Sequence, residues 1–188
     1  MAIEEAEYTV IKKDTHFEIR DYAPHIIAET VVQGNLKDAG DIAFKKLFGY
    51  ISGDNRSRDK VSMTAPVSQK PEGEKIEMTA PVAQQRDKES WVVSFMMPST
   101  YTIKTLPEPE DNEITLRQVP ARRMAAIRYS GFWSEEGYLR HKAELESWIN
   151  KMGLTIVGVP IWARYNPPFL PWFLRRNEVL IPIDAGTD

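Results

Sequence analysis

Two methionines stand at matched positions of a repeated motif and could act as soft metal ligands. The phrase Met-Thr-Ala-Pro-Val occurs twice, beginning at Met63 and at Met78. Each copy alternates apolar with small or polar residues, which predicts a β-hairpin with strands over 61–67 and 76–82 and a turn at 70–75. Such a hairpin presents both thioethers on one apolar face. A thioether there could bind a soft metal ion, although methionine on an apolar strand face usually fills a core.

Adjacent arginines near the C-terminus could bind an anionic ligand. Arg175 lies three residues and Arg176 two residues upstream of Glu178. A guanidinium holds a carboxylate with two parallel hydrogen bonds, so the pair could recognise a carboxylate-bearing ligand. The alternative is that one arginine pairs with Glu178 or another internal carboxylate and fixes the last strand.

Signals for catalysis or metal binding are otherwise missing from the sequence. The chain contains no cysteine, so it has no thiolate ligand and no cysteine nucleophile. It also has no glycine-rich phosphate loop and no nucleophile elbow. His16, His25 and His141 do not form a cluster at metal-binding spacing. His141 lies at the edge of an apolar helical stripe, where packing is commoner than ligation. We therefore assign no catalytic residue and no metal ligand.

Charge and hydropathy argue against binding to nucleic acid and against insertion into a membrane. The chain has 24 basic and 27 acidic residues in 188, a formal net charge of −3, which argues against a nucleic-acid-binding surface. The longest apolar run, 154–163, is too short for a bilayer span of about 20 residues. The acidic segment 1–7 lacks the basic-then-apolar order of a secretory signal. We expect a cytoplasmic protein that binds a small molecule and does not insert into membranes.

Two helices are predicted from apolar periodicity. The helix over 134–153 has Ser134 as its N-cap, Gly153 as its C-cap and one apolar stripe, which is typical of a packing helix. The helix over 37–51 has a much wider apolar arc, because aromatic side chains extend its apolar face. That helix is either buried on two sides, for example beneath the proline-rich C-terminal loop, or it forms one wall of a ligand pocket.

The pocket interpretation places Phe44 and Phe48 of the first helix opposite an apolar segment near the C-terminus. Ligand pockets are mostly apolar with a few polar anchors, and this pair of segments has that composition. The side chains expected to close the pocket are Tyr165, Phe169, Leu170, Trp172 and Phe173.

The order of elements predicts an α+β fold. The expected strands are 8–11, 16–20, 25–32, 61–67, 76–82, 91–97, 113–117, 124–129, 155–165 and 178–183. Together they fit a strongly bent antiparallel sheet or distorted barrel flanked by two long helices. Because strands, a helix and further strands occur twice, we expect one domain over 1–188 built from duplicated halves at about 6–105 and 112–186.

The doubled Met-Thr-Ala-Pro-Val phrase resembles the SOUL, or haem-binding-protein, family. The same likeness extends to Trp91-Val92-Val93-Ser94-Phe95-Met96-Met97-Pro98, to Ser130-Gly131-Phe132, and to the segments Ala163-Arg164-Tyr165-Asn166-Pro167-Pro168-Phe169 and Arg175-Arg176-Asn177-Glu178-Val179. The resemblance implies a distorted barrel with two long helices, similar to gyrase-inhibitor-like effector-binding domains. It also implies a haem site in a hydrophobic groove between the first helix and the loop before the last strand.

Carried over by position, the family site contains Asp41 and Leu170 where relatives can offer basic side chains to the haem propionates. Lys45 and Lys46 are the nearby basic residues. Asp21 stands where some members have been proposed to use a histidine, and aspartate is a poor replacement for imidazole on iron. The candidate binding residues are Asp41, Phe44, Lys45, Phe48, Met63, Tyr165, Phe169, Leu170, Trp172, Phe173, Arg175 and Arg176.

The resemblance implies reversible binding of haem or another tetrapyrrole with weak or no axial coordination, as in a carrier, buffer or sensor. A second hypothesis is an effector-binding module for other amphipathic small molecules, because Asp41 would suit a cationic ligand. A third is a small hydrolase or a tetrapyrrole-modifying enzyme.

Overall fold

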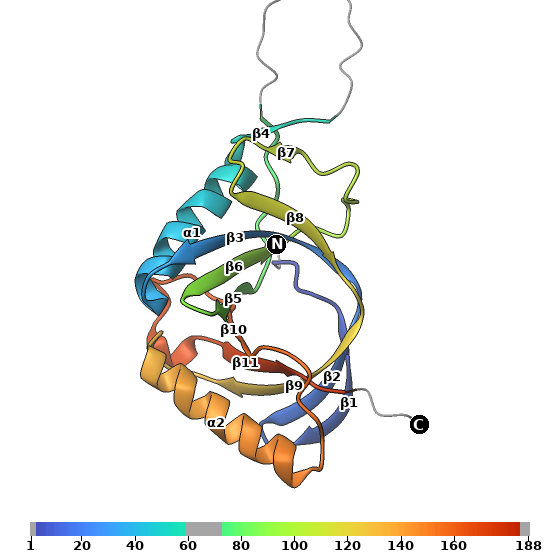
Figure 1. Ribbon diagram of the computed structural model, residues 1–188, viewed down its shortest axis with the longest axis vertical. Helices are drawn as coiled ribbons and strands as arrows, with labels where there is room; N and C mark the ends of the chain where they lie inside the picture. The colour runs from blue at the N-terminus through green and yellow to red at the C-terminus, as the bar shows by residue number, and fades with distance from the viewer. Residues whose placement is uncertain (1–2, 59–72, 185–188) are drawn as a thin grey trace, which may run out of the picture.

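In the computed structural model, which describes residues 3–58 and 73–184, the chain folds into a curled antiparallel sheet with two long helices on its outer side (Figure 1). Within this part, the main sheet has nine strands in the order β1-β2-β9-β11-β10-β5-β6-β3-β8. Their bounds are β1 Tyr8–Asp14, β2 Phe17–Tyr22, β3 His25–Gln33, β5 Val82–Asp87, β6 Ser90–Met96, β8 Ile114–Val119, β9 Arg122–Tyr129, β10 Ile161–Arg164 and β11 Asn177–Pro182. The remaining elements are α1 Leu36–Ser52, α2 Glu135–Lys151, the 3-10 turn η1 Trp172–Leu174, and the short pair β4 Asn55–Arg56 and β7 Glu108–Pro109. The α+β prediction is confirmed.

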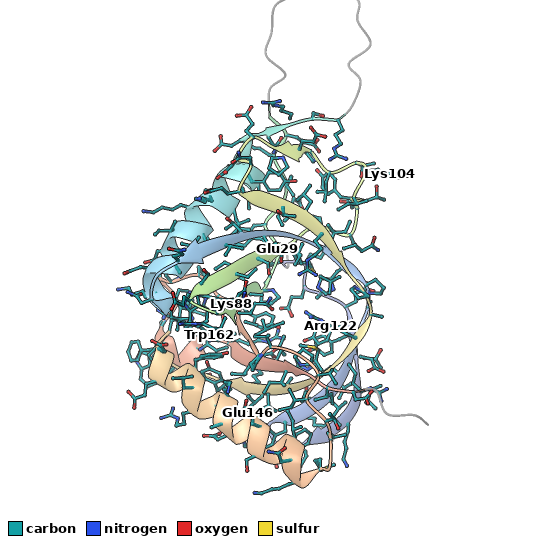
Figure 2. All side chains as sticks on the ribbon, in the orientation of Figure 1. Glu29, Lys88, Lys104, Arg122, Glu146 and Trp162 are labelled. Atoms are coloured by element: carbon teal, nitrogen blue, oxygen red, sulfur yellow. The ribbon has the colours of Figure 1, made fainter. Side chains whose placement is uncertain are left out.

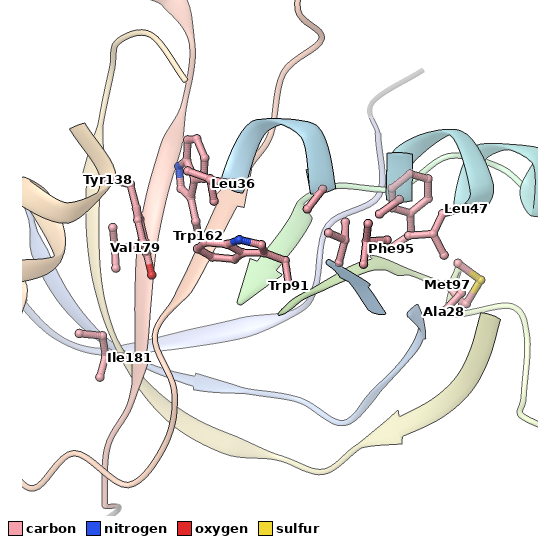
Figure 3. Close-up of a cluster of buried hydrophobic side chains, with 14 of the residues drawn as sticks. Ala28, Leu36, Leu47, Trp91, Phe95, Met97, Tyr138, Trp162, Val179 and Ile181 are labelled. Carbon is pink, nitrogen blue, oxygen red and sulfur yellow. The ribbon is translucent and has the colours of Figure 1, made fainter. Parts of the chain in front are cut away.

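Side-chain alternation on the strands gives the sheet two different faces. On β6, Trp91 and Phe95 point to the convex face, where they pack in the main core beneath the helices. Figure 3 shows this core, with Leu47 from α1 and Tyr138 from α2 among the buried side chains. The opposite, concave face has a smaller apolar cluster that includes Met124 of β9. The curl of the sheet therefore leaves a hollow on the side away from the helices.

The strand order is symmetric about the junction of β10 and β5. One half contains β2-β3-α1-β5-β6 and the other contains β8-β9-α2-β10-β11. In each half the first strand pairs with the second strand of the other half, because β2 pairs with β9 and β8 pairs with β3. This exchange supports our proposal that the domain consists of duplicated halves.

Both predicted helices are present, and their ends follow from local capping. Helix α1 begins after Asn35, whose side-chain oxygen accepts a 2.9 Å hydrogen bond from the backbone N–H of Asp38. It ends at Gly53, whose φ of 128° is unfavourable for residues with a Cβ. Helix α2 begins after Ser134, as predicted. Its C-cap is Met152 rather than the predicted Gly153, which takes the next position with a φ of 69°. In residues 3–58 and 73–184, no helix is long and apolar enough to cross a membrane.

The Ser134 cap gives a prediction about stability. Its hydroxyl accepts a 3.1 Å hydrogen bond from the backbone N–H of Gly137. Replacing Ser134 with alanine leaves that N–H without its protein partner, so we expect a loss of about 1 kcal/mol in the free energy of unfolding, measured by urea denaturation. Ser147→Ala is the matched control, since Ser147 is exposed inside α2 and its replacement should be neutral or slightly stabilising. Equal stability of the two variants would contradict the capping role.

The predicted hairpin is not formed as expected. Its first strand, 61–67, lies outside the described residues, and its second, 76–82, is wrong because the ladder strand β5 begins only at Val82. Pro81 has no N–H to donate to a ladder, and Ala80 forms an isolated parallel bridge with Glu5 instead. Met78 is exposed, and Ile76 takes the buried position next to the core. The strand expected over 155–165 is likewise reduced to β10.

Candidate functional site

The first-helix residues of the expected pocket do not share one environment. Phe44 is half-buried and contacts Phe95 of β6 edge to face, with ring centroids 5.3 Å apart. Phe48 stacks on Phe44 at 5.8 Å and is largely exposed. Asp41 and Lys45 are exposed on the same helix. Phe44 is therefore mainly a packing residue, while Phe48 remains available at the surface.

The loop between β10 and β11 forms an exposed aromatic patch. Trp172 stacks on Phe132, with ring centroids 5.3 Å apart, and meets Phe173 edge to face at 5.6 Å. Phe132 is 64% exposed, Trp172 48% and Phe173 59%. The backbone N–H of Gly131 donates to the carbonyl of Trp172. This hydrogen bond connects the loop between β9 and α2, which carries Phe132, to the loop between β10 and β11. We call Phe132, Trp172 and Phe173 the aromatic patch.

Arg175 supports the loop that carries this patch. Its Nε donates to the carbonyl of Leu170 at 2.7 Å, and its Nη2 donates to the carbonyl of Pro168 at 2.6 Å. Leu170 is half-buried, whereas Phe169 is 84% exposed. Arg175, which we expected to bind an anion, thus donates two hydrogen bonds to the loop backbone and holds the loop in shape.

A groove of about 200 Å³ lies beside the N-terminal ends of α1 and α2. We call it the helix-end groove. Of the predicted site residues, Asp41 lines it. The residues that line it are Asn35, Leu36, Lys37, Asp41, Trp133, Glu135, Trp162 and Arg164.

Arg164 is the notable side chain of this groove. Its guanidinium carbon lies 5.2 Å from the ring centre of Trp133 and 5.1 Å from that of Trp162. Its Nη2 donates to Gln84 Oε1 at 3.1 Å, but its buried Nε has no hydrogen-bond partner among the described residues. Burial lowers the pKa of Arg164 to about 10, and the charge of Asp41 acts in the opposite direction. At neutral pH the group is therefore a half-buried cation whose buried Nε is an unused donor.

Two neighbouring residues shape the groove around Arg164. A Cβ added at Gly40 of α1 would lie 3.1 Å from Gln84 Oε1 and 3.3 Å from Arg164 Nη2, so glycine allows the close approach of this helix. The Arg175 guanidinium carbon lies 4.8 Å from the ring centre of Trp133. Trp133 is thus in contact with both Arg164 and Arg175, and it connects the helix-end groove to the loop that bears the aromatic patch.

Two of the expected site residues lie elsewhere, around Glu178 of β11. The Tyr165 hydroxyl donates to Glu178 Oε2 at 2.8 Å, and Arg176 Nε donates to Oε1 at 3.0 Å. Arg20 donates to both Glu178 oxygens, at 2.7 and 3.1 Å. Arg176 also binds Glu5. Tyr165 and Arg176 therefore belong to an internal ionic network. This agrees with the alternative prediction that one of the two arginines pairs with Glu178.

The electrostatics of this network follow from its burial. Glu178 is fully buried. Burial alone would raise the pKa of Glu178, but the hydrogen bonds and charges of Arg20 and Arg176 outweigh it and hold that pKa below its ordinary value. Burial also raises the pKa of Tyr165 well above its usual range, so its hydroxyl remains a donor. The network fixes the last strand to β2 and to the N-terminal segment.

In the described part of the chain, the methionine and histidine side chains considered as metal ligands do not form a common site. Met78 is exposed, and Met63 lies outside the described residues. His141 packs against the ring of Tyr129, with centroids 3.8 Å apart, and burial lowers the pKa of this histidine. His16 packs against Phe17. Within the described part of the chain, no group of three or more His, Asp or Glu side chains is arranged to hold a metal ion.

Arg164 and Trp133 were not predicted as site residues from the sequence. Each carried a weak signal: Trp133 directly precedes the Ser134 N-cap, and Arg164 stands inside the Ala-Arg-Tyr-Asn-Pro-Pro-Phe phrase. Their meeting at α1 depends on strand pairing between β10 and β5, which local patterns do not specify.

Two solved structures illustrate the similarity of this fold to known ones. The C-terminal domain of EcmrR matches with a TM-score of 0.64 and 10% identity, over 94% of this chain and 98% of that one. A hydrolase from Listeria innocua matches with a TM-score of 0.57 and 11% identity, over 93% of this chain and 94% of that one. At these identities the likeness concerns the fold alone, and no curated protein matches the sequence.

The family comparison covers almost the whole chain. The family model described as SOUL heme-binding protein matches residues 3–182, which include both helices and every strand of the main sheet. The chain therefore belongs to the SOUL heme-binding protein family.

Proposed function

We propose that this protein reversibly binds haem or a related tetrapyrrole at the helix-end groove and the neighbouring aromatic patch. The observation that carries the proposal is Arg164, a half-buried cation between two indole rings with an unused Nε donor. A tetrapyrrole carboxylate that approached this guanidinium would gain a charge-assisted hydrogen bond. Membership of the SOUL heme-binding protein family supports the ligand class.

The aromatic patch supplies the apolar part of the proposed site. Phe132 and Trp172 stack on each other, and Phe132 directly precedes Trp133, which lines the groove. Covering such rings with a macrocycle removes apolar surface from water, worth about 25 cal/mol per Å². Because the groove holds only about 200 Å³, it would accept a carboxylate-bearing edge of the ligand while most of the macrocycle lies across the patch.

The residues fit such a ligand without an axial bond to iron. Among the described residues that line the groove there is no histidine, methionine or tyrosine. Lys37 and Arg164 would hold carboxylates, and Trp133 would face the ring. When bound, haem would supply redox-active iron, while the protein's part is to hold the carboxylates and shield one face from water. Without strong coordination, we expect affinity in the micromolar range.

A titration with haem and with metal-free protoporphyrin tests this proposal. We expect both ligands to bind one to one, with dissociation constants within about threefold of each other, because the iron adds little. The measurement follows the Soret band and quenching of tryptophan fluorescence.

Methionine variants control for axial ligation. Met63→Leu and Met78→Leu should bind haem like the original protein, because the proposal assigns no thioether to iron. A preference of more than about 30-fold for the iron form, abolished by either variant, would contradict the proposal and identify an axial ligand.

A further inference from the structure

The concave face of the sheet contains a separate cleft, on the side away from α1 and α2. Its volume is about 70 Å³. Apolar side chains form most of its wall, and Figure 2 shows Glu29 and Arg122 inside the curl of the sheet. The apolar residues that line it include Ile27, Val92, Met96, Val119, Met124, Ile161 and Leu180.

Charge in the cleft is unbalanced. Glu29 of β3 receives two hydrogen bonds from Arg117 of β8, both 3.0 Å long, so this pair neutralises itself. Arg122 of β9 also lines the cleft and is half-buried, and no described residue offers it a hydrogen bond or ion pair. The cleft thus has one surplus positive charge.

The other polar groups near Arg122 cannot balance it. Tyr22 stands opposite Arg122 in the strand register, and burial raises the pKa of this tyrosine to about 12, so its hydroxyl stays neutral. His25 places its Nδ1 3.0 Å from the carbonyl of Ala23, and burial lowers the pKa of its imidazole. A half-buried guanidinium without a counter-ion is costly, and an incoming anion would remove that cost.

We propose that the concave cleft binds a short-chain carboxylate, with the carboxylate on Arg122 and the alkyl chain against Met96 and Met124. A guanidinium is well matched to a carboxylate because it offers two parallel donors. The apolar walls favour a ligand with an alkyl tail over inorganic anions. The small volume excludes a macrocycle, so this site is separate from the proposed tetrapyrrole site and goes beyond that function.

Methionine-methyl NMR tests this site directly. With ¹³C-methyl methionine labelling, titration with butyrate and hexanoate should shift the signals of Met96 and Met124 saturably. The chemical shifts of Met97 and Met152, which pack in the main core on the convex face of the sheet, should not change. Met96→Leu and Met124→Leu assign the two responding signals.

Neighbouring arginines give a matched pair of variants. Arg122→Gln should weaken butyrate binding at least tenfold, whereas Arg123→Gln should change it less than twofold, because Arg123 binds Asp21 on the other face of the strand. Removing an unpaired cation should leave the fold intact. An unchanged Met97 methyl signal in the Arg122→Gln variant checks this. Butylammonium, which carries the same alkyl chain with a positive charge, should not bind.

Three results would overturn the inference: no saturable shift at Met96 and Met124, equal affinity of Arg122→Gln, or tighter binding of butylammonium than of butyrate. These outcomes are independent of the tetrapyrrole titration, because the helix-end groove contains no methionine. A carboxylate that bound only at that groove would leave the cleft methyl signals unchanged and would count against the cleft site.

Discussion

Replacing Glu178 with glutamine is expected to lower the free energy of unfolding by about 3–5 kcal/mol. Glu178 is fully buried and accepts hydrogen bonds from Arg20, Arg176 and Tyr165. Glutamine has nearly the same shape but no charge, so the buried guanidinium of Arg20 would keep only its partly buried pair with Glu18. For a domain of this size the loss corresponds to a fall of roughly 10 °C in the melting temperature.

Thermal and urea denaturation measure this effect, with Asp21→Asn as the matched control. Asp21 forms a comparable two-bond pair with Arg123, at 2.7 and 2.9 Å, but its side chain is 40% exposed. Because solvent screens that pair, its loss should cost less than about 1 kcal/mol. Similar losses in the two variants would mean that burial does not set the strength of the Glu178 network.

The same network predicts a dependence of stability on pH. The pKa of Glu178 lies below its ordinary value of 4.5 in the folded protein, so its ionised form favours folding at neutral pH. That contribution is fully present above the unfolded pKa and is lost as the pH falls through the lower, folded pKa. The gap in stability between the original protein and Glu178→Gln should therefore stay constant from pH 6 to 8 and close in acid. A constant gap below pH 4 would contradict this assignment.

Local sequence signals predicted the helices better than the hairpin, for a physical reason. Ser134 and Gly153 act within one turn of α2, so their roles could be inferred from neighbouring residues. The segment 76–82 has the alternation of a strand, yet Pro81 has no N–H for a ladder and the chain there pairs with the N-terminal segment instead. Periodicity describes which faces a strand would have, but not whether a partner strand is present.

The candidate sites were harder to predict because pairing between strands far apart in the sequence places their charged residues. Arg122 and Arg123 are neighbours in sequence, and the register with β2 places one in the cleft and the other against Asp21. Arg164 likewise reaches its groove only because β10 pairs with β5. Aromatic type alone could not show that Phe44 contacts Phe95 of β6, so Phe44→Ala would report on stability as well as on binding.

The double variant Phe132→Ser/Trp172→Ser is expected to weaken haem and protoporphyrin binding about 100-fold without destabilising the fold. Each ring exposes enough apolar surface to contribute about 1.5 kcal/mol when a macrocycle covers it, and tenfold in affinity corresponds to about 1.4 kcal/mol. Both side chains are exposed in the described structure, at 64% and 48%, so their loss should change the free energy of unfolding by less than about 0.5 kcal/mol.

Ile11→Ser is the matched control for that variant, because Ile11 is 50% exposed on the edge strand β1 and its replacement removes apolar surface elsewhere. Its affinity for protoporphyrin should remain within about twofold of the original. Fluorescence and Soret titrations measure the affinities, and urea denaturation checks the fold. If the double variant bound as tightly as Ile11→Ser, the aromatic patch would not be the ligand platform. The rings of the patch stack on one another and are exposed to solvent. If affinity were retained without them, the macrocycle would have to lie on another surface, such as Phe48 of α1.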